Sequence, residues 1–126
     1  MADQYLFLIV EPDWDSDAYV GEGAGEQIAA EFPGFEAFER RVAELGARIV
    51  AGNALHNRRH GGVVRPGPEG REVEGAVWTD GASLEGDEVI SGYYVIEAES
   101  EDIARQLAPL VPTGGHIEWR RVFPMG

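Results

Sequence analysis

The chain has 126 residues, the size of one domain, and its 44% of hydrophobic residues can build a packed core. It contains no cysteine, which excludes disulfides, thiolate metal sites and a cysteine nucleophile. A formal net charge of -13 opposes contact with phosphate backbones and anionic lipid heads, so we expect neither nucleic acid nor a membrane as a partner.

The first predicted element is a strand over residues 4–10, a short apolar run rich in β-formers that Pro12 follows. The run is too short to span a membrane and no basic segment precedes it. We therefore expect no signal or transmembrane segment and a cytoplasmic location. A loop is predicted over residues 13–25, where three aspartates and three glycines occur without a clean period.

A helix is predicted within residues 26–48, where apolar side chains recur on one face. Pro33 is expected to start this helix or to kink an earlier turn. Gly46 stands where a C-terminal capping glycine belongs. The apolar stripe consists of Phe35, Phe38, Val42 and Leu45.

A strand and a hairpin are predicted next. The strand covers residues 47–55, and Gly52 inside it suggests a β-bulge. Residues 61–78 have the pattern of a hairpin that turns around residues 66–70, which are rich in proline and glycine.

The last third of the chain has the pattern of a strand, a helix and a strand. Residues 91–100 form the most convincing strand, and Ser100 is a natural N-cap for a helix that runs to residue 111. The final strand lies in residues 115–124. The expected buried face of the helix consists of Ile103, Leu107 and Leu110.

This order of elements predicts an α+β fold close to the split βαβ, ferredoxin-like pattern. Two helices can cover only one face of such a sheet, yet the strands are apolar on both faces. In the first strand Tyr5, Phe7 and Ile9 alternate with three further apolar residues. A second copy packed sheet against sheet would cover the free face and give a homodimer. The alternative, compatible with the first, is a ligand cavity lined by that face.

Two short motifs have the residue types of a metal site. The aspartates at positions 13, 15 and 17 begin like a calcium loop, but Ala18 and Ala24 stand where the loop needs Gly and Glu. His56 and His60 are four residues apart, and a site there would need a third ligand such as Asp80. No H-E-x-x-H pattern supports it. We therefore predict no metal and no cofactor, and assign the histidines to the surface or, for His56, to a polar or acid–base role.

Acid–base chemistry is the reaction type for which the sequence has the ingredients. His56, Asp80 and His116 each fall at the end of a predicted strand. A carboxylate beside an imidazole can orient the ring and tune its pKa towards neutrality. Asp80 with Gly81 is also a common turn pair, so the sequence leaves open whether Asp80 is a turn residue or a pocket residue.

Four stretches across almost the whole chain carry a family pattern: "QYLFLIVEPD", "GARIVAGNALH", "VWTDGASLEGDEVISGYYVIEAESEDIARQLA" and "HIEWRRV". Through them the chain resembles the YCII-related family, in its DGPF-domain branch. The third stretch is similar to the segment written T-D-G-P-F, an acidic tail, G-[GY]-[YF], a strand and a helix opened by Ser. The residues that fit are Asp80, Gly81, Glu85 and Glu88; those that depart are Ala82 and Ser83, in place of Pro and Phe, and Asn53, in place of Glu.

The resemblance implies a dimeric α/β barrel of ferredoxin-like protomers, with residues 1–126 as a single YCII-related domain. Some relatives resemble muconolactone isomerases or act in dechlorination of aromatic breakdown products. A His–Asp pair has been proposed as catalytic in one branch.

We therefore expect a small cytoplasmic homodimer that binds a small organic molecule and runs proton-transfer chemistry, with Asp80 and His56 as the acid–base pair. Arg120 would hold a substrate carboxylate through two hydrogen bonds. The alternative is a non-catalytic ligand-binding or regulatory protein. The remaining expected substrate-binding residues are Tyr94, Trp119 and His116.

Overall fold

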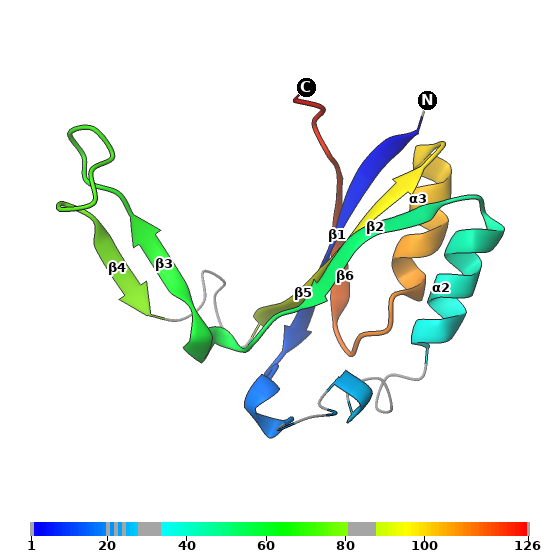
Figure 1. Cartoon of the computed structure of the whole chain (residues 1–126), viewed down its shortest axis with the longest axis horizontal. Helices are drawn as coiled ribbons and strands as arrows, with labels where there is room; N and C mark the ends of the chain where they lie inside the picture. The colour runs from blue at the N-terminus through cyan, green and yellow to red at the C-terminus, as the bar shows by residue number, and fades with distance from the viewer. Residues whose placement is uncertain are drawn as a thin grey trace.

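Four antiparallel strands and two α-helices form the main body of the protein (Figure 1). The structure, a computed structural model, describes residues 2–19, 21, 23, 25–27, 34–80 and 88–125. Pro33, which was predicted to start a helix or to kink an earlier turn, lies outside these residues. So do residues 81–87, which follow Asp80.

The main sheet has the strand order β2-β5-β1-β6, and every neighbouring pair is antiparallel. Each α-helix links two strands that have one strand between them, as expected of two split βαβ units. The α+β class is therefore confirmed, and the strand order is compatible with a ferredoxin-like protomer. The strands are β1 (Asp3–Pro12), β2 (Arg48–Ala54), β5 (Glu88–Ala98) and β6 (His116–Arg121).

Helices α2 (Phe35–Glu44) and α3 (Glu101–Leu107) pack on the same face of the sheet (Figure 1). Helix α2 ends as predicted, because Gly46 adopts a left-handed φ of 73° just beyond it. Helix α3 begins as predicted, with the Ser100 hydroxyl accepting the backbone N–H of Ile103 at 3.3 Å.

One expectation for the second helix is wrong. Leu110 is 45% exposed rather than buried, because α3 ends at Leu107 and continues as the 3-10 turn η3 (Ala108–Leu110). The tighter winding of a 3-10 turn rotates its last residue away from the face that Leu107 buries.

The core lies between the sheet and the two helices. As predicted, Tyr5, Phe7 and Ile9 are buried on this face, where they pack with residues of α2 and α3. Burial of each such large side chain stabilises the fold by about 1.5–3 kcal/mol. The largest fully buried side chains are Tyr5, Phe7, Phe38, Ile96 and Leu107.

The opposite face of the sheet carries apolar side chains that neither helix covers. Leu6 pairs with Val95 and Leu8 with Tyr93 across the central strands, and all four side chains are only partly buried. Val10, also predicted for this face, is buried. The face is therefore apolar along its centre, as the alternating pattern predicts.

The bulge in β2 occurs at a different residue from the one predicted. The register between β2 and β5 shifts between Ile49 and Ala51, so Val50 is the extra residue. Gly52 instead allows strand β2 to approach the ring of Tyr94 closely, because a Cβ at position 52 would lie 2.7 Å from Cδ1 of Tyr94.

The predicted hairpin forms a two-stranded ribbon that extends away from the main sheet (Figure 1). We call residues 62–80 the hairpin arm; its strands are β3 (Gly62–Arg65) and β4 (Val77–Asp80). The turn is longer than predicted, since the second strand begins only at Val77. Trp78 in this arm is 71% exposed. Among the described residues no helix is long and apolar enough to cross a membrane.

Candidate functional site

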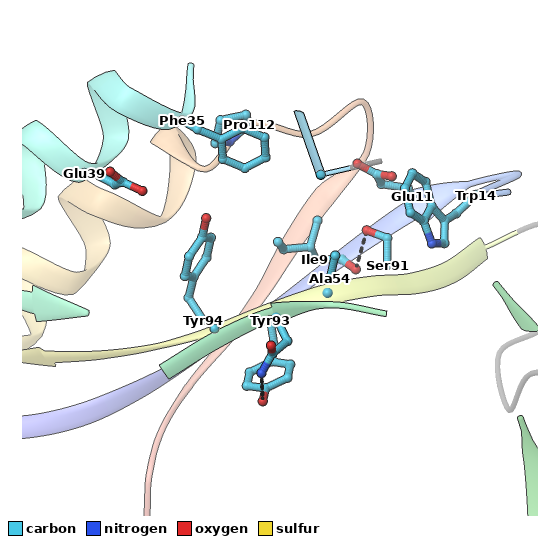
Figure 2. A pocket seen from close by; sticks show the side chains of 14 residues that line it. Ile9, Glu11, Trp14, Phe35, Glu39, Ala54, Ser91, Tyr93, Tyr94 and Pro112 are labelled. Carbon is cyan, nitrogen blue, oxygen red and sulfur yellow. Dashed lines mark hydrogen bonds between the residues drawn. The ribbon is translucent and has the colours of Figure 1, made fainter. Parts of the chain in front are cut away.

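A cavity of about 370 Å³ lies between the sheet and the N-terminal half of α2 (Figure 2). We call it the sheet–helix cavity. Its walls come from the end of β1, the middle of β2 and β5, helix α2 and the segment that precedes β6. Segments far apart in the sequence thus meet around one space, as is usual for ligand sites.

Small residues in the two neighbouring strands make room for this cavity. Gly52 and Gly92 lie in its floor, with Ser91 and Ala54 beside them. A Cβ on Gly92 would lie 2.8 Å from the backbone oxygen of Asn53, so the two strands could not keep their spacing with a larger residue there. The glycines of "AGNAL" and "SGYY" therefore shape the cavity.

Tyr94 is the central aromatic residue of the cavity wall. Its ring points from β5 towards α2, where Glu39 lies above it (Figure 2). The ring packs against Phe38 with 5.1 Å between ring centroids. Burial, and secondarily the charge of Glu39, raise the pKa of Tyr94 above 10.0. The phenol is therefore protonated near neutral pH and offers a hydrogen-bond donor to the cavity.

Glu11 and Trp14 form the other end of the cavity (Figure 2). Glu11 is only 8% exposed, and its Oε1 accepts a hydrogen bond from the Thr113 hydroxyl at 2.8 Å. Trp14 donates its indole N–H to the backbone oxygen of Leu55 at 2.8 Å, which fixes the ring at the cavity edge. The cavity therefore combines aromatic surface with two carboxylates, those of Glu11 and Glu39.

Sequence reasoning missed Glu11, although a signal existed. Glu11 directly follows the apolar run of the first strand, where a charged residue is buried only if it has partners. Its partner Thr113 is 102 residues away, in a segment with no recognisable pattern. Only the antiparallel pairing of β1 with β6 brings the two together.

A second group of polar side chains gathers where two 3-10 turns meet, η1 (Ser16–Ala18) and η2 (Arg58–His60). Asp17, His56 and His60 each offer one donor atom, and these atoms lie within 4.8 Å of one another. We call these three residues the histidine cluster. His60 Nε2 donates to Oδ1 of Asp17 at 2.8 Å, and the two imidazole rings stack with centroids 4.2 Å apart.

The surrounding residues hold the histidine cluster in place. Asn57 donates through Nδ2 to Oδ1 of Asp15 at 2.7 Å and to Oδ2 of Asp17 at 2.9 Å. Arg59 forms ion pairs with the same two carboxylates at 3.0 and 2.8 Å. Ser16 Oγ accepts the backbone N–H of Asn57 at 2.7 Å and lies 3.0 Å from Nδ1 of His56.

These contacts keep Asp17 ionised. The hydrogen bond from Asn57, followed by the one from His60, holds the pKa of Asp17 below its usual value. Burial acts in the opposite direction but has a smaller effect. The carboxylate of Asp17 is therefore available as an anionic acceptor throughout the neutral range.

The structure places His56 against Ser16 and His60, while Asp80 lies at the end of the hairpin arm, where it pairs with Gly62. Within the described part of the chain, no hydrogen bond or ion pair joins Asp80 to His56. Among the described residues, the carboxylate in contact with an imidazole is that of Asp17. Residues 81–87, which complete the Asp-Gly segment, lie outside the described residues.

Apart from Tyr94, the predicted substrate-binding residues all lie on β6. His116 and Trp119 share a second hollow, of about 440 Å³, between β6 and α3. The Arg105 guanidinium lies 5.2 Å from the ring centroid of Trp119. Arg120 points to the other face of the sheet, as its pairing with Leu6 requires, and forms an ion pair with Glu118 at 3.3 Å.

No family model matches the chain, and no curated protein is similar enough to count as a match. Its similarity to the YCII-related family therefore stays a prediction from the motifs.

Proposed function

We propose that the protein binds a small organic molecule in the sheet–helix cavity. The observation that carries this proposal is the composition of the walls, in which Trp14, Phe35 and Tyr94 supply aromatic surface around a floor of small residues. Cavities of a few hundred Å³ with this mixture of apolar lining and few polar groups are typical ligand sites.

The polar groups of the cavity define the ligand class. Glu11 and Glu39 are both acceptors with negative charge, and Tyr94 offers its phenol. The matching ligand has an apolar or aromatic body and carries an amine or another hydrogen-bond donor. Arg120 was expected to hold a substrate carboxylate, but it is on the opposite face of the sheet, so this ligand needs no carboxylate.

We also propose that two copies pack through their open sheet faces, which gives the dimeric α/β barrel implied by the YCII-related resemblance. Leu6, Leu8, Tyr93 and Val95 form an apolar centre on this face. Charged pairs flank this centre: Arg48 of β2 pairs with Glu97 of β5, and Arg120 pairs with Glu118 within the outer strand β6. An apolar centre with a polar rim is the usual anatomy of an interface between proteins.

The proton-transfer chemistry predicted for His56 and Asp80 stays a prediction. An imidazole–carboxylate pair supports such chemistry, and the pair present among the described residues is His60 with Asp17. The segments that carry these residues also line the cavity through Trp14 and Ala54. An enzyme of this kind would turn over the ligand, whereas the non-catalytic alternative would only bind it.

A thermal-shift screen of organic amines and neutral aromatic metabolites tests the binding proposal. A ligand at 100 times its Kd is expected to add about 2.7 kcal/mol of apparent stability. The variant Ala54→Phe places a ring inside the cavity and is expected to weaken binding about tenfold or more.

The matched control is Ala43→Phe, which adds the same ring on the exposed surface of α2 and is expected to bind like wild type. Binding that is equally strong in Ala54→Phe would contradict the location of the site. Each confirmed ligand is then incubated with wild type, His56→Ala and Asp80→Asn, and product formation by chromatography separates an enzyme from a binding protein.

A further inference from the structure

We propose that Asp17, His56 and His60 form a binding site for one divalent transition metal ion of the zinc class. These three residues do not line the sheet–helix cavity, and the test measures binding of a metal ion rather than of an organic ligand. Two imidazole nitrogens with one carboxylate oxygen are a common donor set for Zn²⁺ and its neighbours in the first transition row. Ca²⁺ and Mg²⁺ prefer all-oxygen sites, so this set selects against them.

The distances between the donor atoms suit such an ion. Ligand atoms on a tetrahedral Zn²⁺ are about 3.4 Å apart, as follows from bond lengths near 2.1 Å. The three donors here lie within 4.8 Å of one another. Binding would separate Asp17 Oδ1 and His60 Nε2, now 2.8 Å apart, by a few tenths of an ångström and draw His56 inward. The ion would take the place of the proton that these two atoms share.

The two oxygens of Asp17 are already divided between two tasks. Oδ2 accepts a hydrogen bond from Asn57 at 2.9 Å and forms the ion pair with Arg59 at 2.8 Å. Oδ1 faces His60 and is the oxygen left for a metal ion. A carboxylate ligand whose second oxygen is held in this way is oriented before the ion arrives.

His56 is oriented by the same principle. Its Nδ1 lies 3.0 Å from Ser16 Oγ, and that hydroxyl is itself anchored by the backbone N–H of Asn57. This contact leaves Nε2 of His56 as the nitrogen for coordination. Metal-bound histidines in proteins have such a partner on their other nitrogen in almost all cases.

The charge around the cluster favours a cation. Asp15 and Asp17 contribute two negative charges, and Arg59 neutralises one of them. The imidazoles bind metal in their neutral forms, so a divalent ion would meet one net negative charge nearby and a chain of formal charge -13. Three protein ligands also leave a coordination position for water or for a small molecule.

Titration of tag-free, EDTA-treated and desalted protein with CoCl₂ and ZnCl₂ tests the proposal. Wild type is expected to bind one Co²⁺ per chain with visible absorption bands, and Zn²⁺ is expected to displace it. Asp17→Asn and His60→Ala are expected to lower the affinity for Zn²⁺, measured against a chromophoric chelator, by at least tenfold.

Two matched controls separate coordination from non-specific binding. Asp13→Asn removes the same charge from the same loop, and Asn tolerates the φ of 51° at this position. His116→Ala removes the one histidine outside the cluster. Both are expected to bind like wild type. His60→Gln, together with circular dichroism spectra, replaces His60→Ala if that variant fails to fold. No binding by wild type, or equal affinities in the cluster and control variants, would overturn the proposal.

Discussion

Tyr94 is the residue on which burial and charge in the sheet–helix cavity act together. Burial disfavours the phenolate, and the carboxylate of Glu39 disfavours it further, so both raise the pKa of Tyr94. Burial is the larger cause. A ligand that carries a cation between these groups would reduce the effect of Glu39, which makes Tyr94 a reporter of the cavity.

Glu39→Gln is expected to lower the pKa of Tyr94 while leaving it above 10.0, because burial of the ring remains. The pKa can be followed through the chemical shift of ¹³C at the ζ position of labelled tyrosine as pH is raised. Glu36→Gln, an exposed position on the same helix, serves as the control. An unchanged pKa in Glu39→Gln would show that Glu39 does not act on the cavity.

The same shift has a consequence for stability at alkaline pH. The folded state holds the proton of the Tyr94 phenol more tightly than the unfolded state does. The contribution of this protonated phenol to the free energy of unfolding is therefore complete below pH 10.0. It is lost as pH rises above that value. Tyr94→Phe is expected to reduce the loss of stability between pH 9 and pH 11 in urea titrations, without abolishing it. Tyr5, whose pKa is also raised by burial, remains in this variant. An equally steep loss in Tyr94→Phe would contradict the assignment.

Among the elements, the start of helix α3 is a boundary that the sequence predicts correctly. Ser100 caps the helix, and Glu101 and Asp102 stand in its first turn, where negative charge favours the positive end of the helix dipole. These signals are local, because the cap and its partner are only three residues apart. Local signals of this kind can be recognised without knowledge of the fold.

Ser100→Ala is expected to lower the free energy of unfolding by about 1 kcal/mol, since the N–H of Ile103 loses its acceptor. Urea denaturation measures the change. Ser100→Asp restores an acceptor and is expected to remain within a few tenths of a kcal/mol of wild type. A loss as large in Ser100→Asp would mean that the side chain of Ser100 stabilises the protein in some other way.

The histidine cluster could not be predicted as one site from the sequence. Both halves were recognised, the aspartates near residue 15 and the histidines of "HNRRH", but as separate motifs with separate partners. The contacts that join them span about 40 residues, as between Asn57 and Asp17. They depend on two 3-10 turns, which are too short to show hydrophobic periodicity.

For the whole molecule, alternation within strands was the informative signal. The burial of Tyr5, Phe7 and Ile9 and the partial exposure of Leu6 and Leu8 follow from it, whereas the α+β class follows from the order of the elements. The sheet–helix cavity does not, because its walls are defined by tertiary contacts. Of the six predicted site residues, Tyr94 is the one that lines it.

If two chains form a dimer, the mass of the protein in solution is twice that of one chain. Wild type is expected to elute with twice the 13.7 kDa of one chain in size-exclusion chromatography with light scattering. Leu8→Glu would bury a charge in the apolar centre of the open face and is expected to give monomers. Ala43→Glu, which adds the same charge to the exposed surface of α2, is expected to stay dimeric. A monomeric wild type would contradict the packing of two sheets.

Amide chemical shifts in ¹⁵N-labelled protein report whether a ligand binds in the sheet–helix cavity. Titration with the strongest thermal-shift ligand is expected to move the amide signals of Gly52 and Gly92 in the cavity floor. The signals of the hairpin arm and of residues 116–121 should stay in place. Shifts confined to the hairpin arm or to β6, with Gly52 and Gly92 unaffected, would contradict binding in this cavity and would place the ligand on another surface.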